Sequence, residues 1–77
     1  MRPKKKSLGL VIVSLREHAK LSQELLAERA GVHRTYISQL ERNLKSPTVE
    51  TLTKIAFALG HKASRLLQLM EGDFDEL

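Results

Sequence analysis

The sequence predicts an all-α domain of five helices, and three observations support this fold class. At 77 residues, the chain has room for one domain. Apolar residues recur at helical spacing along most of the chain, and no stretch alternates apolar and polar residues with the period of two typical of a strand. Only short connections separate the helical stretches, which favours helices packed around one core.

The first two expected helices begin after serines whose hydroxyls can cap a helix N-terminus. Ser7 precedes the first helix, and its apolar stripe consists of Leu8, Val11, Ile12, Leu15 and Ala19. Ser22 begins the second helix, which ends before Gly31.

The third helix is expected from about His33 to Arg42. Val32 and Ile37 are spaced as a hydrophobic staple at its start. Asn43 can adopt the left-handed conformation that usually falls to glycine after a helix.

A loop containing Pro47 separates the third helix from the fourth. Thr48 is the expected cap of the fourth helix and Gly60 its end, and its apolar face consists of Val49, Leu52, Ile55, Ala56 and Leu59. Ser64 begins the fifth helix.

The chain has a formal net charge of +4, and its charged residues are unevenly distributed along the sequence. The first six residues contain the basic residues Arg2, Lys4, Lys5 and Lys6, and the last seven contain the acidic residues Glu71, Asp73, Asp75 and Glu76. We expect a flexible basic arm over residues 1–6, one domain over residues 7–71 and a frayed acidic tail over residues 72–77. A modestly basic body favours a polyanion or an acidic surface as partner, although solubility alone also explains a charge of this size.

Catalysis, metal binding and membrane insertion have no support in the sequence. There is no Cys, which excludes disulfides and thiolate zinc sites and fits a reducing cytoplasm. His18, His33 and His61 are not spaced as metal ligands, and no catalytic triad order or Gly-rich phosphate loop occurs. The longest apolar run, residues 8–13, is far too short to cross a bilayer. We expect a cytoplasmic protein that is not an enzyme and has no cofactor, no metal and no membrane contact.

The spacing within about residues 23–42 predicts a helix-turn-helix. Ala27 is small enough for two helices to cross closely, and Gly31 tolerates the positive φ that a tight turn requires. Ile37 and Leu40 then anchor the second helix of the motif to the core.

This motif resembles that of the Cro/CI-like (XRE-type) DNA-binding proteins, over roughly Leu15 to Leu59. The second, third and fourth helices of that family correspond to "LSQELLAERAG", "YISQLERN" and "SPTVETLTKIAFALG". Within the family, "RTYIS…ERN" on a chain of this length looks most like the controller proteins of restriction–modification systems. The resemblance implies a five-helix lambda-repressor-like domain whose second and third helices form the motif. Asn43 replaces the commoner Gly after the third helix.

The resemblance further implies that the third helix enters the major groove of double-stranded DNA. The residues expected to contact bases are Arg34, Thr35, Ser38 and Gln39. Arg34 is the strongest of these, because its planar fork can bond guanine O6 and N7 together; the alternative is a solvated helix charge. The residues expected to contact phosphates are Gln23, Tyr36, Arg42, Asn43, Lys45 and Ser46. The basic arm either follows the DNA or is a solvated tail.

Two further expectations concern stability and assembly. By resemblance, Arg16 and Glu41 form a largely buried ion pair between the first and third helices; the alternative is two unrelated surface charges. The fifth helix has an apolar stripe too wide for one side of a small bundle, consisting of Leu66, Leu67, Leu69 and Met70. Either all four side chains pack in the core, or part of this face, together with Phe74, forms a two-fold dimer interface.

The sequence therefore predicts a homodimeric transcription regulator that binds a pseudo-palindromic operator. Whether two dimers form a tetramer on the DNA is left open. The specific hypothesis is a restriction–modification controller that regulates its own gene. A phage-type repressor or an antitoxin-like regulator is the near alternative. A helical protein–protein interaction module, whose third helix meets an acidic protein surface, is the alternative from another class.

Overall fold

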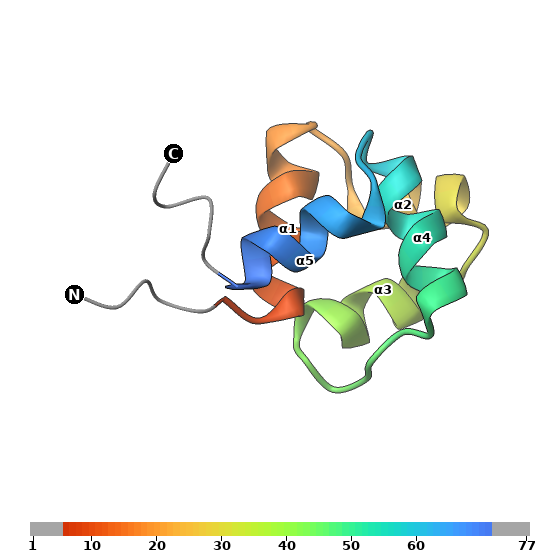
Figure 1. Cartoon of the computed structure of the whole chain (residues 1–77). Coiled ribbons are helices and arrows are strands. Elements are labelled where there is room, and N and C mark those ends of the chain that lie inside the picture. Colours follow the sequence, from red (N-terminus) through yellow and green to blue (C-terminus); the bar gives the residue numbers. More distant parts are fainter. Residues whose placement is uncertain (1–5, 72–77) are drawn as a thin grey trace.

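Five α-helices contain most of residues 6–71, the part of the chain that the computed structural model describes (Figure 1). They are α1 (Leu8–His18), α2 (Gln23–Ala30), α3 (Arg34–Glu41), α4 (Val49–Ala58) and α5 (Ala63–Glu71). The predicted all-α, five-helix fold class is confirmed.

Side-chain caps begin three of the helices at the predicted residues. The hydroxyls of Ser7, Ser22 and Thr48 each accept a hydrogen bond from the amide three residues further on, at 3.0–3.1 Å. Each bond satisfies an amide that the helix itself leaves without a partner. The fifth helix differs by one residue from the prediction, because it begins at Ala63 rather than at Ser64.

Four helices end in the same way, with one residue in the left-handed conformation. These residues are Lys20, Gly31, Asn43 and Gly60, with φ of 61°, 73°, 61° and 86°. In each case the amide of the following residue bonds to the carbonyl five residues earlier; for α3, Leu44 bonds to Gln39 at 2.8 Å. This is the Schellman motif, which turns the chain sharply and satisfies the last carbonyls. The sequence predicts the two glycines and Asn43, whereas nothing in it indicates Lys20.

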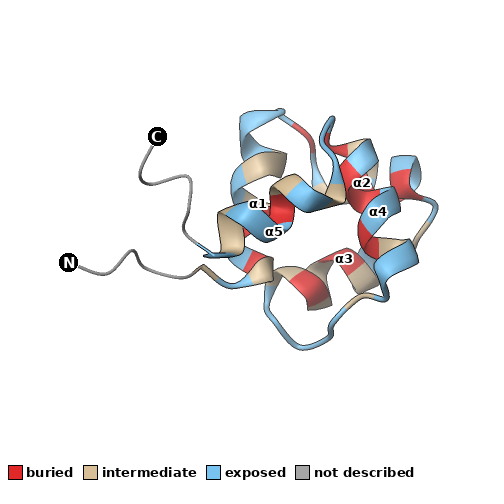
Figure 2. Ribbon diagram, viewed as in Figure 1, coloured by how far each residue is buried: buried red, intermediate tan, exposed pale blue. Residues whose placement is uncertain are grey.

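Buried residues occur on all five helices (Figure 2), and their side chains form two clusters that share α1 and α4. The first cluster lies between α1, α2, α3 and α4. It consists of Ile12, Leu21, Leu26, Ala27, Ala30, Ile37, Leu40, Ile55 and Leu59. The second joins α1, α4 and α5 and consists of Val11, Leu52, Ala56 and Leu66. The clusters are joined through Val11 and Ile12, which are adjacent on α1, and through Ile55 and Ala56, which are adjacent on α4.

Two residues predicted for buried helix faces are exposed, and both lie at helix ends. Ala19 follows the last residue of α1 and forms its C-cap. Val49 is the first residue of α4 and is 80% exposed. Periodicity places both on an apolar stripe, but the neighbouring helices do not extend far enough to cover these ends.

The start of α1 lies against the end of α3 at a contact that only glycine allows. A Cβ on Gly9 would lie 2.6 Å from the carbonyl oxygen of Leu40, and closer still to that of Glu41. The buried Gly9 amide donates to Oδ1 of Asn43 at 3.0 Å, and Nδ2 of Asn43 donates to the Ser7 hydroxyl at 3.1 Å. Asn43 therefore ends α3 and caps α1 from a distance, a role that the sequence analysis did not identify.

Both chain ends lie mostly outside the described residues. This applies to residues 1–5 of the predicted arm and residues 72–77 of the predicted tail. The backbone amide of Lys6, assigned to the arm in the sequence analysis, donates to the carbonyl of Met70 at 3.0 Å and so joins the start of the domain to α5. Within residues 6–71, none of the helices combines the length and the apolar character that a membrane crossing requires.

We expect glycine to have opposite effects at Lys20 and Asn43, although both have φ of 61°. Lys20→Gly should raise the free energy of unfolding by about 0.5–1 kcal/mol, because glycine adopts this conformation without a Cβ clash. Asn43→Gly should lower it by about 1–2 kcal/mol, because the buried Gly9 amide loses its acceptor. Urea unfolding followed by circular dichroism measures both changes. Stabilisation by both substitutions would show that the Asn43 side chain contributes nothing.

Candidate nucleic-acid interface

The third helix has an apolar face and a polar face. Ile37 and Leu40 are 0% and 1% exposed and hold α3 against the core. The other side consists of the predicted base-contacting residues Arg34, Thr35, Ser38 and Gln39. The first two are exposed and the last two half-buried, and none of the four side chains has a hydrogen-bond partner within residues 6–71. Their donors remain available to a ligand.

An ion pair joins the end of this helix to α1. Nε of Arg16 lies 2.6 Å from Oε2 of Glu41, and Nη2 lies 3.2 Å from Oε1. The same carboxylate accepts a bond from Nε2 of Gln23 at 2.7 Å, while Nη1 of Arg16 donates to the carbonyl of Leu21 at 2.9 Å. The Glu41 side chain is 5% exposed and that of Arg16 15% exposed. Hydrogen bonding to Glu41 raises the pKa of Arg16 against the opposing effect of burial, so the guanidinium stays charged.

This ion pair also determines the charge of the polar face. Glu41 is the only acidic residue between Gly31 and Glu50. Because its carboxylate is neutralised and turned inward, the polar face of α3 and the loop after it present donors and cations without an opposing anion. Such a surface favours a polyanion.

Four of the predicted phosphate contacts lie at the edges of this face. Arg42 is the exposed C-cap of α3, and Lys45 and Ser46 are exposed in the loop before α4. Tyr36 is half-buried and packs against the first core cluster. Tyrosine commonly buries its ring in this way while its hydroxyl remains at the surface.

The other two predicted phosphate contacts, Gln23 and Asn43, have structural roles. The amide of Gln23 donates to the buried carboxylate of Glu41. The amide of Asn43 bonds to both Gly9 and Ser7. Each NH₂ group has two donor hydrogens, so one remains on each residue for a phosphate oxygen.

The expectation of a dimer face on α5 needs correction at one residue. Leu66 is 0% exposed and belongs to the second core cluster, so its assignment to a dimer interface is wrong. Leu69 and Met70 are half-buried against that cluster, whereas Leu67 is 47% exposed. Phe74 lies outside the described residues.

A large exposed apolar side chain on α4 was missed in the sequence analysis. Phe57 is 83% exposed, and Val49, two helical turns earlier, is 80% exposed. Phe57 lies off the buried stripe of α4, which includes Ile55 and Leu59. That mismatch was the available sequence signal, because exposed apolar residues mark an interaction surface where several of them form a patch.

No group of three or more metal-ligating side chains occurs within residues 6–71. The three histidines lie on separate elements: His18 ends α1, His33 precedes α3 and His61 lies in the turn before α5.

A short two-helix unit whose second helix is anchored by apolar residues and exposes hydrogen-bond donors is the arrangement of a helix-turn-helix domain. The helix-turn-helix family model matches residues 12–74. The chain belongs to this family, in its Cro/CI-like (XRE-type) class of non-enzymatic, DNA-binding transcription regulators.

Two relatives illustrate the range of the family. An uncharacterised helix-turn-helix-type transcriptional regulator of Mycobacterium tuberculosis is 49% identical over 51 residues, which cover 66% of this chain and 36% of the relative. The chain thus spans about a third of that protein. Control protein C.SmaI of Serratia marcescens is 43% identical over 63 residues, which cover 82% of this chain and 75% of the relative.

Solved structures agree with this assignment. The DNA-binding domain of the P22 c2 repressor superposes with a TM-score of 0.83 at 30% identity, covering 96% of this chain and 93% of that one. The restriction–modification controller protein C.AhdI from Aeromonas hydrophila superposes with a TM-score of 0.75 at 32% identity. The superposition covers 77% of this chain and 89% of that one.

We expect the Arg16–Glu41 ion pair to be worth much more than a surface pair. Arg16→Ala or Glu41→Ala should each lower the free energy of unfolding by about 3–5 kcal/mol, because either change leaves a largely buried charge without its ionic partner. Replacing both partners, as Arg16→Met with Glu41→Leu, should cost clearly less than the sum of the single changes. Arg29→Ala, which removes an exposed arginine from α2, is the matched control, with an expected change below about 0.5 kcal/mol. If Arg16→Ala and Arg29→Ala both changed the free energy of unfolding by the same small amount, the ion pair would not contribute more than a surface pair.

Proposed function

We propose that this protein is a sequence-specific transcription regulator that inserts the polar face of α3 into the major groove of DNA. The observation that carries the proposal is that this face offers several donors without partners among the described residues and no free carboxylate. Arg34 lies in the first turn of α3, the part of a recognition helix that contacts base edges. Arg42 and Lys45 flank the face and are suited to phosphates, which fix the register of the helix on the duplex.

The proposal includes a homodimer on a pseudo-palindromic operator. One domain reads too few base pairs for useful selectivity against competing genomic sites. A two-fold dimer presents two recognition helices roughly 34–36 Å apart, one turn of the duplex.

The proposed dimer interface is an apolar patch that spans α4 and α5 and consists of Val49, Phe57, Leu67 and Met70. Three of these side chains are exposed, by 80%, 83% and 47%, and Met70 is half-buried. Val49 and Phe57 are eight residues apart and share one side of α4, next to the side on which Leu52 and Ala56 pack with Leu66 of α5. We therefore propose that the exposed residues of the two helices border the contact between α4 and α5.

The specific role that we propose is a restriction–modification controller with autoregulation. The similarity to C.SmaI, over 75% of that protein, supports it. A phage-type repressor is the second candidate, because the similarity to the P22 c2 repressor domain extends over 96% of this chain. An antitoxin-like regulator has no separate support. In the alternative from another class, a protein–protein module, the α3 face binds an acidic protein surface instead of DNA.

Selection of bound duplexes from a random pool tests the DNA-reading role. The protein should enrich a pseudo-palindromic motif, and Arg34→Ala should lose discrimination at one base pair per half-site, at a cost of about 1–3 kcal/mol. Arg29→Ala should leave the motif unchanged. The absence of any enriched motif would favour the protein–protein module, and the same motif from Arg34→Ala would exclude Arg34 as a base reader.

Sedimentation equilibrium tests the proposed interface. Leu67→Ser combined with Phe57→Ser should weaken dimerisation at least tenfold, because both side chains leave water only in the dimer. Leu10→Ser removes a leucine of similar exposure, 49%, from α1 and is the matched control. Equal weakening by the control, or no effect of the double substitution, would place the interface elsewhere.

A further inference from the structure

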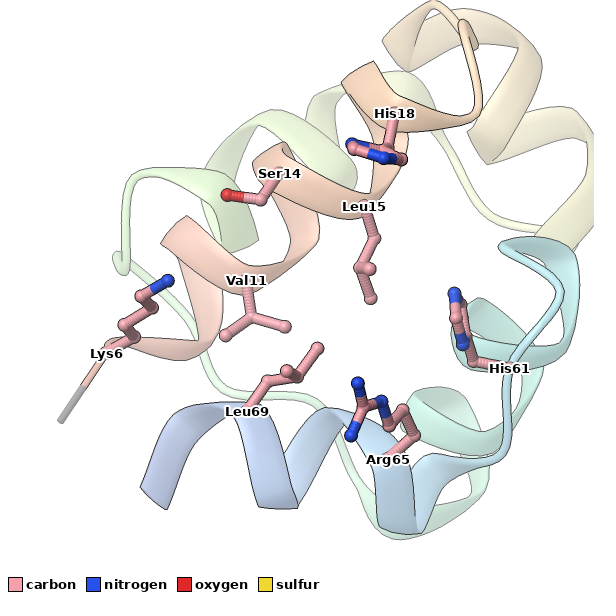
Figure 3. A pocket seen from close by; sticks show the side chains of 8 residues that line it. All are labelled: Lys6, Val11, Ser14, Leu15, His18, His61, Arg65 and Leu69. Carbon is pink, nitrogen blue, oxygen red and sulfur yellow. The ribbon is translucent and has the colours of Figure 1, made fainter. Parts of the chain in front are cut away.

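A groove between α1 and α5 has no part in the proposed DNA or dimer surfaces (Figure 3). Its volume is about 210 Å³. Val11 and Leu15 of α1 form one wall and Leu69 of α5 forms the facing wall, with His61 of the α4–α5 turn at one end. On α5, Leu69 is two residues from Leu67 and therefore points to a different side of the helix.

The polar residues that line this groove are basic or neutral. They are Lys6, Ser14, His18, His61 and Arg65, and none of the acidic residues among positions 6–71 lines the groove. The side chains of Arg65, His18 and His61 have no hydrogen-bond or ion-pair partner within residues 6–71. The Arg65 guanidinium is turned from α5 into the space toward α1 (Figure 3). Within residues 6–71, no carboxylate pairs with this half-buried arginine, so its donors remain available to a ligand.

Apolar walls with a few convergent polar groups at the mouth are typical of small-molecule sites. Arginine suits a carboxylate, because its planar fork can donate two parallel hydrogen bonds. The groove volume of about 210 Å³ is below the range of roughly 300–1,000 Å³ that drug-sized ligands occupy, so the groove suits a short apolar chain.

We propose that this groove is a binding site for a small amphipathic carboxylate. The apolar chain lies between the walls formed by Val11, Leu15 and Leu69, and the carboxylate bonds to Arg65 with His61 beside it. This inference is independent of the proposed DNA-binding role, because the groove contains no residue of α3.

Titration of octanoate into isotope-labelled protein, followed by amide chemical shifts, tests the site. Octanoate should shift the amides of the groove residues on α1 and α5. Octan-1-ol, which lacks the charge, and acetate, which lacks the chain, should each bind at least tenfold more weakly. Equal affinity for octanoate and octan-1-ol, shifts located elsewhere, or no binding would overturn the proposal.

Arg65→Gln should weaken octanoate binding at least tenfold while leaving the rest of the spectrum unchanged. Lys62→Gln, which removes an exposed cation three residues earlier that does not line the groove, should change the affinity less than twofold. Equal effects of the two substitutions would mean that general charge attraction holds the ligand, against the proposal.

The acidic residues at positions 73, 75 and 76 are an alternative occupant, which a triple variant tests. A variant with Asp73→Asn, Asp75→Asn and Glu76→Gln should bind octanoate with unchanged affinity. If this variant bound octanoate more than threefold more tightly, these carboxylates would compete for the groove. That result would overturn the proposal that a small carboxylate is its occupant.

Discussion

The ion pair between Arg16 and Glu41 is the interaction on which the arrangement of the other parts depends. It links α1 to the end of α3, and through Gln23 it includes the start of α2. A helix as short as α3 has little stability of its own, so its orientation has to come from its contacts. The apolar anchors Ile37 and Leu40 hold α3 to the core, and the carboxylate bonded by Arg16 and Gln23 adds a directional contact at its end. The same bonds remove the only anion from the polar face of α3.

α1 packs against both α3 and α5. Gly9 brings it against the end of α3, Ile12 enters the first core cluster and Val11 enters the second. A substitution in the core of α1 is therefore expected to affect α3 and α5 together. Because the next face of α1 lines the groove that contains Arg65, a ligand there would contact the helix that positions α3.

Most of the fold could be predicted from the sequence, because local physics determines where helices begin and end. Ser7, Ser22 and Thr48 act as caps within their own helical turn, and Gly31 and Gly60 adopt conformations that other residues resist. Periodicity failed where burial depends on a neighbour, as it did at Ala19, Val49 and Leu66. It identifies an apolar face but does not say whether another helix, a second copy of the chain or water covers it.

The sequence by itself determined the five helices, the turn at Gly31 and the two faces of α3, since these depend on residues a few positions apart. Only the tertiary structure decided what Asn43 and Gln23 do, because their partners lie 34 and 18 residues away and no local pattern encodes such contacts. It also decided that Leu66 belongs to the core while Phe57 faces outward. Both assignments depend on which sides of α4 and α5 meet, and that choice is made by packing between helices.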